Sequence, residues 1–92
     1  MDTTKKQRRN KKTVIVPPTE ISKSGKSICI KSHLHDIPEE KIRVDLDETQ
    51  LIISASKDNA VVMRKIKVPA GSWISKKKFY GGILEIILDL PL

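Results

Sequence analysis

Apolar and polar residues alternate with a period of two through residues 27–88, which is typical of β-strands that bury one face. The clearest alternation places Ile42, Val44 and Leu46 on one side of an extended segment, with charged residues between them. Residues 50–56 repeat the pattern, and a short polar turn joins the two segments. Together they predict a β-hairpin.

Other short segments with strand-like patterns follow the same rule and are bounded by turn residues. They span residues 27–31, 61–68, 73–79 and 83–88. The last is nearly all apolar, so we expect it to be covered on both faces. Gly81-Gly82 before it suits a tight turn, because glycine adopts positive φ at little cost. Helix is limited to one turn at 39–41.

The N-terminal part of the chain divides into two pieces. Residues 1–13 are polar and basic, which predicts a disordered tail. Val14, Ile15 and Val16 form an apolar run that Pro17-Pro18 stops, so we expect an edge strand or a mobile arm. Residues 14–92 then form one domain. Its short, closely spaced strands predict an all-β fold, an antiparallel immunoglobulin-like β-sandwich.

Composition supports this fold class. A chain of 92 residues holds one small core, and 13 isoleucines and 6 valines against 3 alanines favour strands over helices. Trp73, Phe79 and Tyr80 are the only aromatic residues of the chain, so the core is expected to be aliphatic. The apolar runs are too short to cross a bilayer, and no apolar stretch follows the basic start as in a signal peptide. We therefore expect no membrane association.

Charge is concentrated at the N-terminus. The net charge is +7; residues 1–12 carry six basic side chains and one acidic one, against 12 and 10 in the rest of the chain. Such a tail suits a nucleic acid or an acidic surface, and equally suits a solvated tail. Lys76-Lys77-Lys78 is interpreted as an edge strand that lysines protect against pairing. Cys29 is the single cysteine and fits a reducing cytoplasm.

Four segments resemble the α-crystallin domain of the small heat shock protein (Hsp20) family. In chain order they read LHDIPEEKIRV (34–44), LIISA (51–55), RKIKVP (64–69) and FYGGILEI (79–86). The resemblance covers about three-quarters of the chain. It implies the sandwich fold and an ATP-independent chaperone that binds exposed apolar segments of partly unfolded proteins. It also implies a groove between two strands, for which we expect Val44, Leu46, Trp73 and Ile74 as the lining.

The chain departs from the family pattern at its connections. Many members carry a long loop with an exchanged strand after the second segment, whereas only residues 56–61 fill that gap here. Leu90-Pro91-Leu92 imitates the family's C-terminal "I-x-I" anchor only in its letters, and Val14-Ile15-Val16 is a better-placed imitation. We therefore expect a monomer or homodimer, with Val14, Ile15 and Val16 pairing between subunits, and not a large shell.

Two alternative functions stay open. A short central connection favours an adaptor or co-chaperone of the p23/CS kind that docks on one protein partner, and the basic tail favours a small nucleic-acid-binding protein. No serine lies in a glycine-framed nucleophile elbow, and Gly81-Gly82 lacks the Lys-Ser/Thr of a phosphate loop. We therefore expect no enzymatic activity and no cofactor.

Two polar features remain. Arg64 shares a strand face with Val62 and Ile66, so its stem should be partly buried and its guanidinium should require acceptors, with a carboxylate best suited. The family resemblance implies a subunit-interface role for Arg64. His33 and His35 are spaced for chelation, but a structural zinc site needs four ligands, so we interpret them as part of a polar loop and predict no metal.

Overall fold

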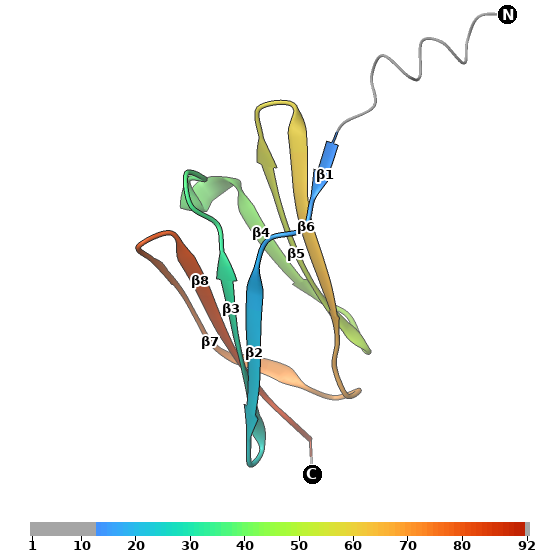
Figure 1. Cartoon of the computed structure of the whole chain (residues 1–92). Coiled ribbons are helices and arrows are strands. Elements are labelled where there is room, and N and C mark those ends of the chain that lie inside the picture. Colours follow the sequence, from blue (N-terminus) through green and yellow to red (C-terminus); the bar gives the residue numbers. More distant parts are fainter. Residues whose placement is uncertain (1–12, 92) are drawn as a thin grey trace, which may run out of the picture.

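The computed structural model of the chain describes residues 13–91 (Figure 1). Its elements are β1 (Thr13–Ile15), β2 (Thr19–Ser24), β3 (Ser27–His33), the 3-10 turn η1 (Glu39–Lys41), β4 (Ile42–Leu46), β5 (Gln50–Lys57), β6 (Ala60–Lys67), β7 (Trp73–Tyr80) and β8 (Ile83–Asp89). Apart from Thr13, which begins β1, the predicted disordered tail lies outside the described residues. No described helix is long and apolar enough to cross a membrane.

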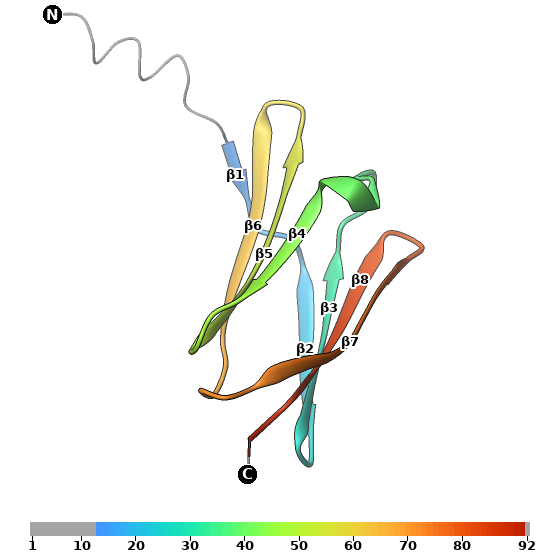
Figure 2. The ribbon, with the colours of Figure 1, turned by 180° about the vertical axis from the view of Figure 1, so that it is seen from behind.

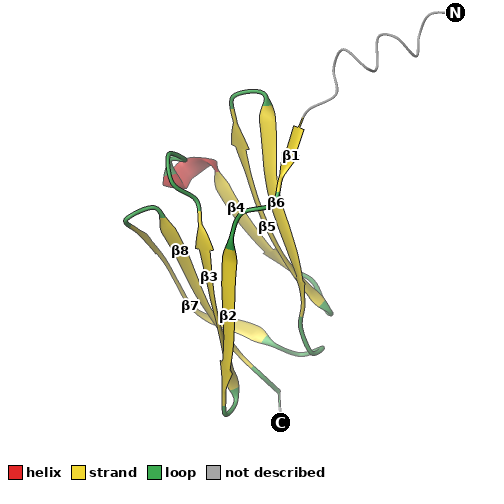
Figure 3. Ribbon diagram, viewed as in Figure 1, coloured by secondary structure: helices red, strands yellow, loops and turns green. Residues whose placement is uncertain are grey.

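The strands form two four-stranded sheets that face each other (Figure 3). One sheet has the order β1-β6-β5-β4 and the other the order β2-β3-β8-β7. Neighbouring strands are antiparallel, except that β1 runs parallel to β6. The predicted all-β sandwich is therefore confirmed, with one parallel pair that the alternation pattern did not predict.

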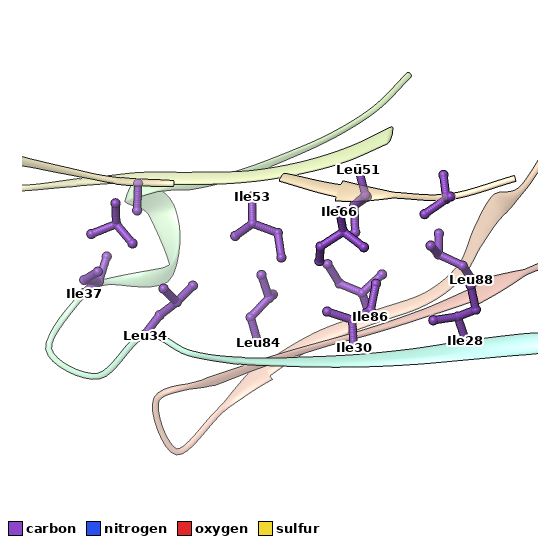
Figure 4. Packing of buried hydrophobic residues seen from close by; sticks show 13 residues of the cluster. Ile28, Ile30, Leu34, Ile37, Leu51, Ile53, Ile66, Leu84, Ile86 and Leu88 are labelled. Carbon is purple, nitrogen blue, oxygen red and sulfur yellow. The ribbon is translucent and has the colours of Figure 1, made fainter. Parts of the chain in front are cut away.

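The core fills the space between the two sheets (Figure 4). Alternate residues of β3, β5, β6 and β8 point inward, as a period of two requires. The most deeply buried aliphatic side chains are Ile30, Leu34, Leu51, Ile53, Leu84, Ile86 and Leu88. Full burial of one such side chain contributes about 2 kcal/mol from the hydrophobic effect, so this layer is the main source of stability.

The two central hairpins follow the predicted alternation. Leu51, Ile53 and Ala55 of β5 are buried, and Ile42 and Val44 of β4 pack against the same core. The turn between β5 and β6 is the two residues Asp58-Asn59, with Asp58 at φ +52°. This tight turn accounts for the absence of any further strand at this position.

β8 differs from its prediction. Its residues alternate between buried positions such as Ile86 and half-buried ones such as Ile83 and Ile87. The inner face of β8 meets the core, whereas its outer face is not covered by a second layer among residues 13–91. The expectation of a strand covered on both faces was wrong, because the outer apolar residues are shielded only by neighbours within the same sheet.

Candidate functional site: an apolar groove and an open strand edge

A hollow of about 400 Å³ lies between the two sheets where their edge strands β4 and β7 approach each other. Both strands are on the near side in Figure 2. The apolar lining of the hollow consists of Ile42 and Val44 of β4 and Leu84 of β8. Leu84 is 2% exposed, so it forms the floor, and the two partly buried β4 side chains form one wall.

Charged side chains border this groove on both sides. Glu39 and Glu40 lie on η1, and Lys77 and Lys78 lie on β7. Lys77 pairs in register with the buried Ile86, so it lies on the inner side of the edge strand and still remains exposed. An apolar hollow with acidic and basic borders suits an extended protein segment whose apolar side chains enter the hollow while its polar groups stay in water.

The structure separates the four residues predicted to line this groove. Val44 lines the hollow. Leu46 and Ile74 pack against the core cluster. Trp73 is 51% exposed and borders a different hollow, with Lys26 and Leu90. Trp73 and Ile74 are consecutive in one strand, so their side chains point to opposite faces and cannot share one lining.

Apart from Val44, the residues that line the groove escaped the sequence interpretation: Glu39, Glu40, Ile42, Lys77, Lys78 and Leu84. Ile42 carried a usable signal, because it has the same parity as Val44 in the alternating segment. Leu84 was predicted only as part of an apolar strand. Lys77 and Lys78 lie in a run of three lysines, and nothing in that run shows which of them border the groove.

The opposite edge of the β4-containing sheet is only partly covered. β1 pairs with β6 from Ala60 to Val62, and no described strand pairs with the same edge of β6 from Met63 to Lys67. Val14, Val16, Met63, Arg64 and Lys65 line a hollow of about 300 Å³ there. A strand edge of this kind can accept another extended segment.

Arg64 lies at this edge, on the inner face of β6. Its neighbours on that face, Val62 and Ile66, are 3% and 8% exposed, so the predicted shared face is confirmed. The Arg64 Nε atom is buried and has no hydrogen-bond partner among the described residues. The acceptor expected from the sequence is therefore missing for this atom.

Val14, Ile15 and Val16 are 63%, 42% and 57% exposed. Val14 and Ile15 lie in β1, and Val16 follows it. Of the two alternatives left open for this run, the structure has the edge strand, formed within the chain. Their pairing between subunits stays a prediction.

A small polar network occupies the outer face of the other sheet. The Tyr80 hydroxyl donates a hydrogen bond of 3.0 Å to a Glu85 carboxylate oxygen, and the Cys29 thiol lies 3.7 Å from the other oxygen. The hydrogen bond lowers the pKa of Glu85 and raises the pKa of Tyr80 from their ordinary values. The Tyr80–Glu85 hydrogen bond joins β7 to β8, and Cys29 lies beside it on β3.

The two histidines lie side by side, with ring centroids 5.8 Å apart. His33 Nε2 is 3.7 Å from a carboxylate oxygen of Glu20 on β2. Among the described residues, no group of three or more metal-ligating side chains comes together.

No protein-family model matches the sequence. A search of curated proteins finds no significant match either.

Solved structures do resemble this chain. A deletion mutant of hsp14.1 from Sulfolobus is 21% identical, with a TM-score of 0.68 over 82% of this chain and 75% of that one. HSP18.5 from E. histolytica is also 21% identical, with a TM-score of 0.69 over 82% and 88%. A C-terminally truncated AgsA, a small heat shock protein from Salmonella typhimurium, is 12% identical, with a TM-score of 0.73 over 83% and 88%.

At identities this low, the structural matches establish the fold alone. Their coverage of 82–83% of this chain shows that both sheets take part in the match. The segments that suggested the family lie on η1–β4, β5, β6 and the β7–β8 hairpin, in the expected order. The chain therefore has the α-crystallin-type β-sandwich fold of the small heat shock proteins.

Proposed function

We propose that this protein is an ATP-independent chaperone that holds exposed apolar segments of partly unfolded proteins. The observation that carries this proposal is the hollow between β4 and β7, whose apolar lining opens to solvent beside two strand edges. A segment in extended conformation would place alternate apolar side chains against Ile42, Val44 and Leu84. Solved small heat shock proteins of the same fold support this function.

Binding in such a groove is reversible and is not driven by nucleotide hydrolysis in this proposal. The one glycine pair of the chain, Gly81-Gly82, lacks the Lys-Ser/Thr of a phosphate loop. It instead forms the tight turn of the β7–β8 hairpin, at φ +56° and +77°. The free energy of binding comes from burying apolar surface of the client, which is non-directional and tolerates many sequences. Broad client range follows from this chemistry.

The test is suppression of heat-induced aggregation for two unrelated client proteins, followed by light scattering. We expect the protein to reduce scattering from both clients, and Val44→Glu to weaken this effect by placing a charge in the groove wall. Val61→Glu is the matched control, because Val61 is a partly buried valine on the outer face of β6. Melting curves of both variants establish that they remain folded.

The outcomes separate the proposal from its alternative. Equal suppression by Val44→Glu and Val61→Glu would remove the groove from the mechanism. Failure to suppress aggregation of either client, with tight binding to a single partner protein, would favour an adaptor of the p23/CS kind.

A further inference from the structure

We propose that the open edge of β6 is a second binding site, which takes an extended acidic segment of a partner protein. The site consists of Met63–Lys67 together with Val14 and Val16 beside it. It lies on the other side of the same sheet from β4, so it is separate from the groove proposed to bind apolar clients. It does not depend on the chaperone proposal.

The backbone supplies the first part of the evidence. β6 runs to Lys67, but the register of β1 ends at the Ile15–Val62 pair. From Met63 onward, alternate residues of β6 present backbone N–H and C=O groups to the side away from β5. An added strand would satisfy these groups and continue the sheet past the end of β1.

The charges of this edge select an acidic partner. Arg64, Lys65 and Lys67 are cationic within four consecutive residues. Their register partners on β5 are uncharged: Ile53 opposite Arg64, Ile52 opposite Lys65 and Gln50 opposite Lys67. Among the described residues, none forms an ion pair with these three side chains. The edge therefore carries positive charge that its own sheet does not neutralise.

Arg64 supplies an unfilled hydrogen-bond position. Its Nε atom is buried without a partner in the described structure, which is costly for a charged donor group. Arg64 also lines the hollow beside Val14 and Met63. A carboxylate on an added strand would meet Arg64 from the open side, and charge-assisted hydrogen bonds to guanidinium are the strong ones.

The same charges argue against a second copy as the occupant. Two β6 edges paired antiparallel about a two-fold axis would bring Arg64, Lys65 and Lys67 of both chains together. Like charges opposite each other across strands are destabilising. A Glu- or Asp-rich strand with an apolar residue for the Val14–Met63 hollow has the complementary pattern.

The probe is a fluorescein-labelled eight-residue peptide of alternating glutamate and valine, and binding to the full chain is measured by fluorescence anisotropy. Two control peptides accompany it: one with lysine in place of glutamate, and one with methyl groups on alternate backbone nitrogens. Methylation keeps the charges and removes the donors that strand addition needs. We expect the acidic peptide alone to bind, and its affinity to fall with added salt.

Two charge-reversal variants locate the site. We expect Lys65→Glu with Lys67→Glu to weaken binding of the acidic peptide by about tenfold or more, as for the loss of one charge-assisted contact. Lys23→Glu with Lys76→Glu is the matched control, with the same change of charge on two exposed lysines of the other sheet. This control should bind the acidic peptide like the parent protein apart from a small general charge effect.

Three results would overturn the proposal. One is equal loss of binding in both double variants, which would mean unspecific attraction to net charge. Another is unchanged binding of the methylated peptide. The third is a dimer in sedimentation velocity that Lys65→Glu with Lys67→Glu abolishes, since the occupant would then be a second copy. None of these results bears on Val44 or the groove.

Discussion

Gly82 lies directly against the imidazole ring of His35, so closely that a β-carbon on Gly82 would overlap His35 Nδ1. The contact joins the β7–β8 turn to the loop after β3. The Gly82 carbonyl also accepts a 2.7 Å hydrogen bond from the Leu34 backbone N–H. A glycine is needed here for two reasons, the close approach and the positive φ of 77°.

We expect Gly82→Ala to destabilise the domain more than Gly81→Ala. Both residues have positive φ, which costs an alanine about 1 kcal/mol. Of the two, only Gly82 has a neighbour within contact range of an added β-carbon. An alanine at position 82 would therefore also clash with His35, which adds about 1–3 kcal/mol to the loss of stability. Urea unfolding of both variants measures the difference. Equal losses would mean that the His35 loop moves away without cost.

The Tyr80–Glu85 hydrogen bond predicts a shifted tyrosine titration. Tyr80 is the only tyrosine of the chain, so the absorbance of tyrosinate reports its pKa directly. We expect this pKa above the ordinary value, because the hydrogen bond to Glu85 and its negative charge both disfavour tyrosinate. Glu85→Gln should lower the pKa toward the ordinary value, and Glu20→Gln, on β2, should leave it unchanged.

The same pair sets the direction of two pH effects on stability. The pKa of Glu85 is lowered in the folded protein, so its contribution is present above the unfolded pKa and is lost as the pH falls through the folded pKa. The pKa of Tyr80 is raised, so its contribution is present below the unfolded pKa and is lost as the pH rises through the folded pKa. Tyr80→Phe should remove the Tyr80 effect and reduce the Glu85 effect, because Lys31, Lys78 and Cys29 also lower the pKa of Glu85.

Two paired isoleucines test the core. Ile21 of β2 and Ile30 of β3 are partners in register, but Ile21 is 47% exposed and Ile30 is fully buried. We expect Ile30→Ala to cost about 2–5 kcal/mol, because it leaves a cavity between the sheets. Ile21→Ala should cost about 0.5 kcal/mol, as for an exposed position. Similar losses in denaturant unfolding would contradict the burial of the β3 face.

The predictable strands are those with a half-buried alternating pattern. β4 shows this best, because Ile42, Val44 and Leu46 alternate with charged residues. β2 was not predicted as a separate strand, since Ile21 is its only apolar residue. It forms because β3 offers a complete register partner, which is a tertiary effect that a local pattern does not contain.

The candidate site was less predictable than the fold. Val44 was identified from its strand, whereas Trp73 was assigned to the wrong face of β7. A register irregularity between Ile74 and Lys76 shifts the later residues of this strand relative to β8. A shift of one residue exchanges the two faces, so the pairing with β8, and not the sequence run, decides that Lys77 lies on the inner face.

Arg64 gives the last prediction, in which stability and partner binding change in opposite directions. The sequence led us to expect an acceptor, best a carboxylate, for the Arg64 guanidinium. The structure instead leaves the Nε atom buried and unpartnered among the described residues. Arg64→Met keeps a long apolar stem and removes the unpaired donor, so we expect the free energy of unfolding to rise by about 1 kcal/mol.

The matched control is Arg43→Met, on the exposed face of β4, which should change the stability by about 0.5 kcal/mol or less. Denaturant unfolding measures both variants, and peptide anisotropy measures their affinity for the acidic peptide. A more stable Arg64→Met protein with weakened peptide binding is the expected pair of results. If Arg64→Met is instead less stable by more than about 1 kcal/mol, the guanidinium has a hydrogen-bond partner within the chain in solution. Arg64 would then offer no free donor to a carboxylate at the open β6 edge.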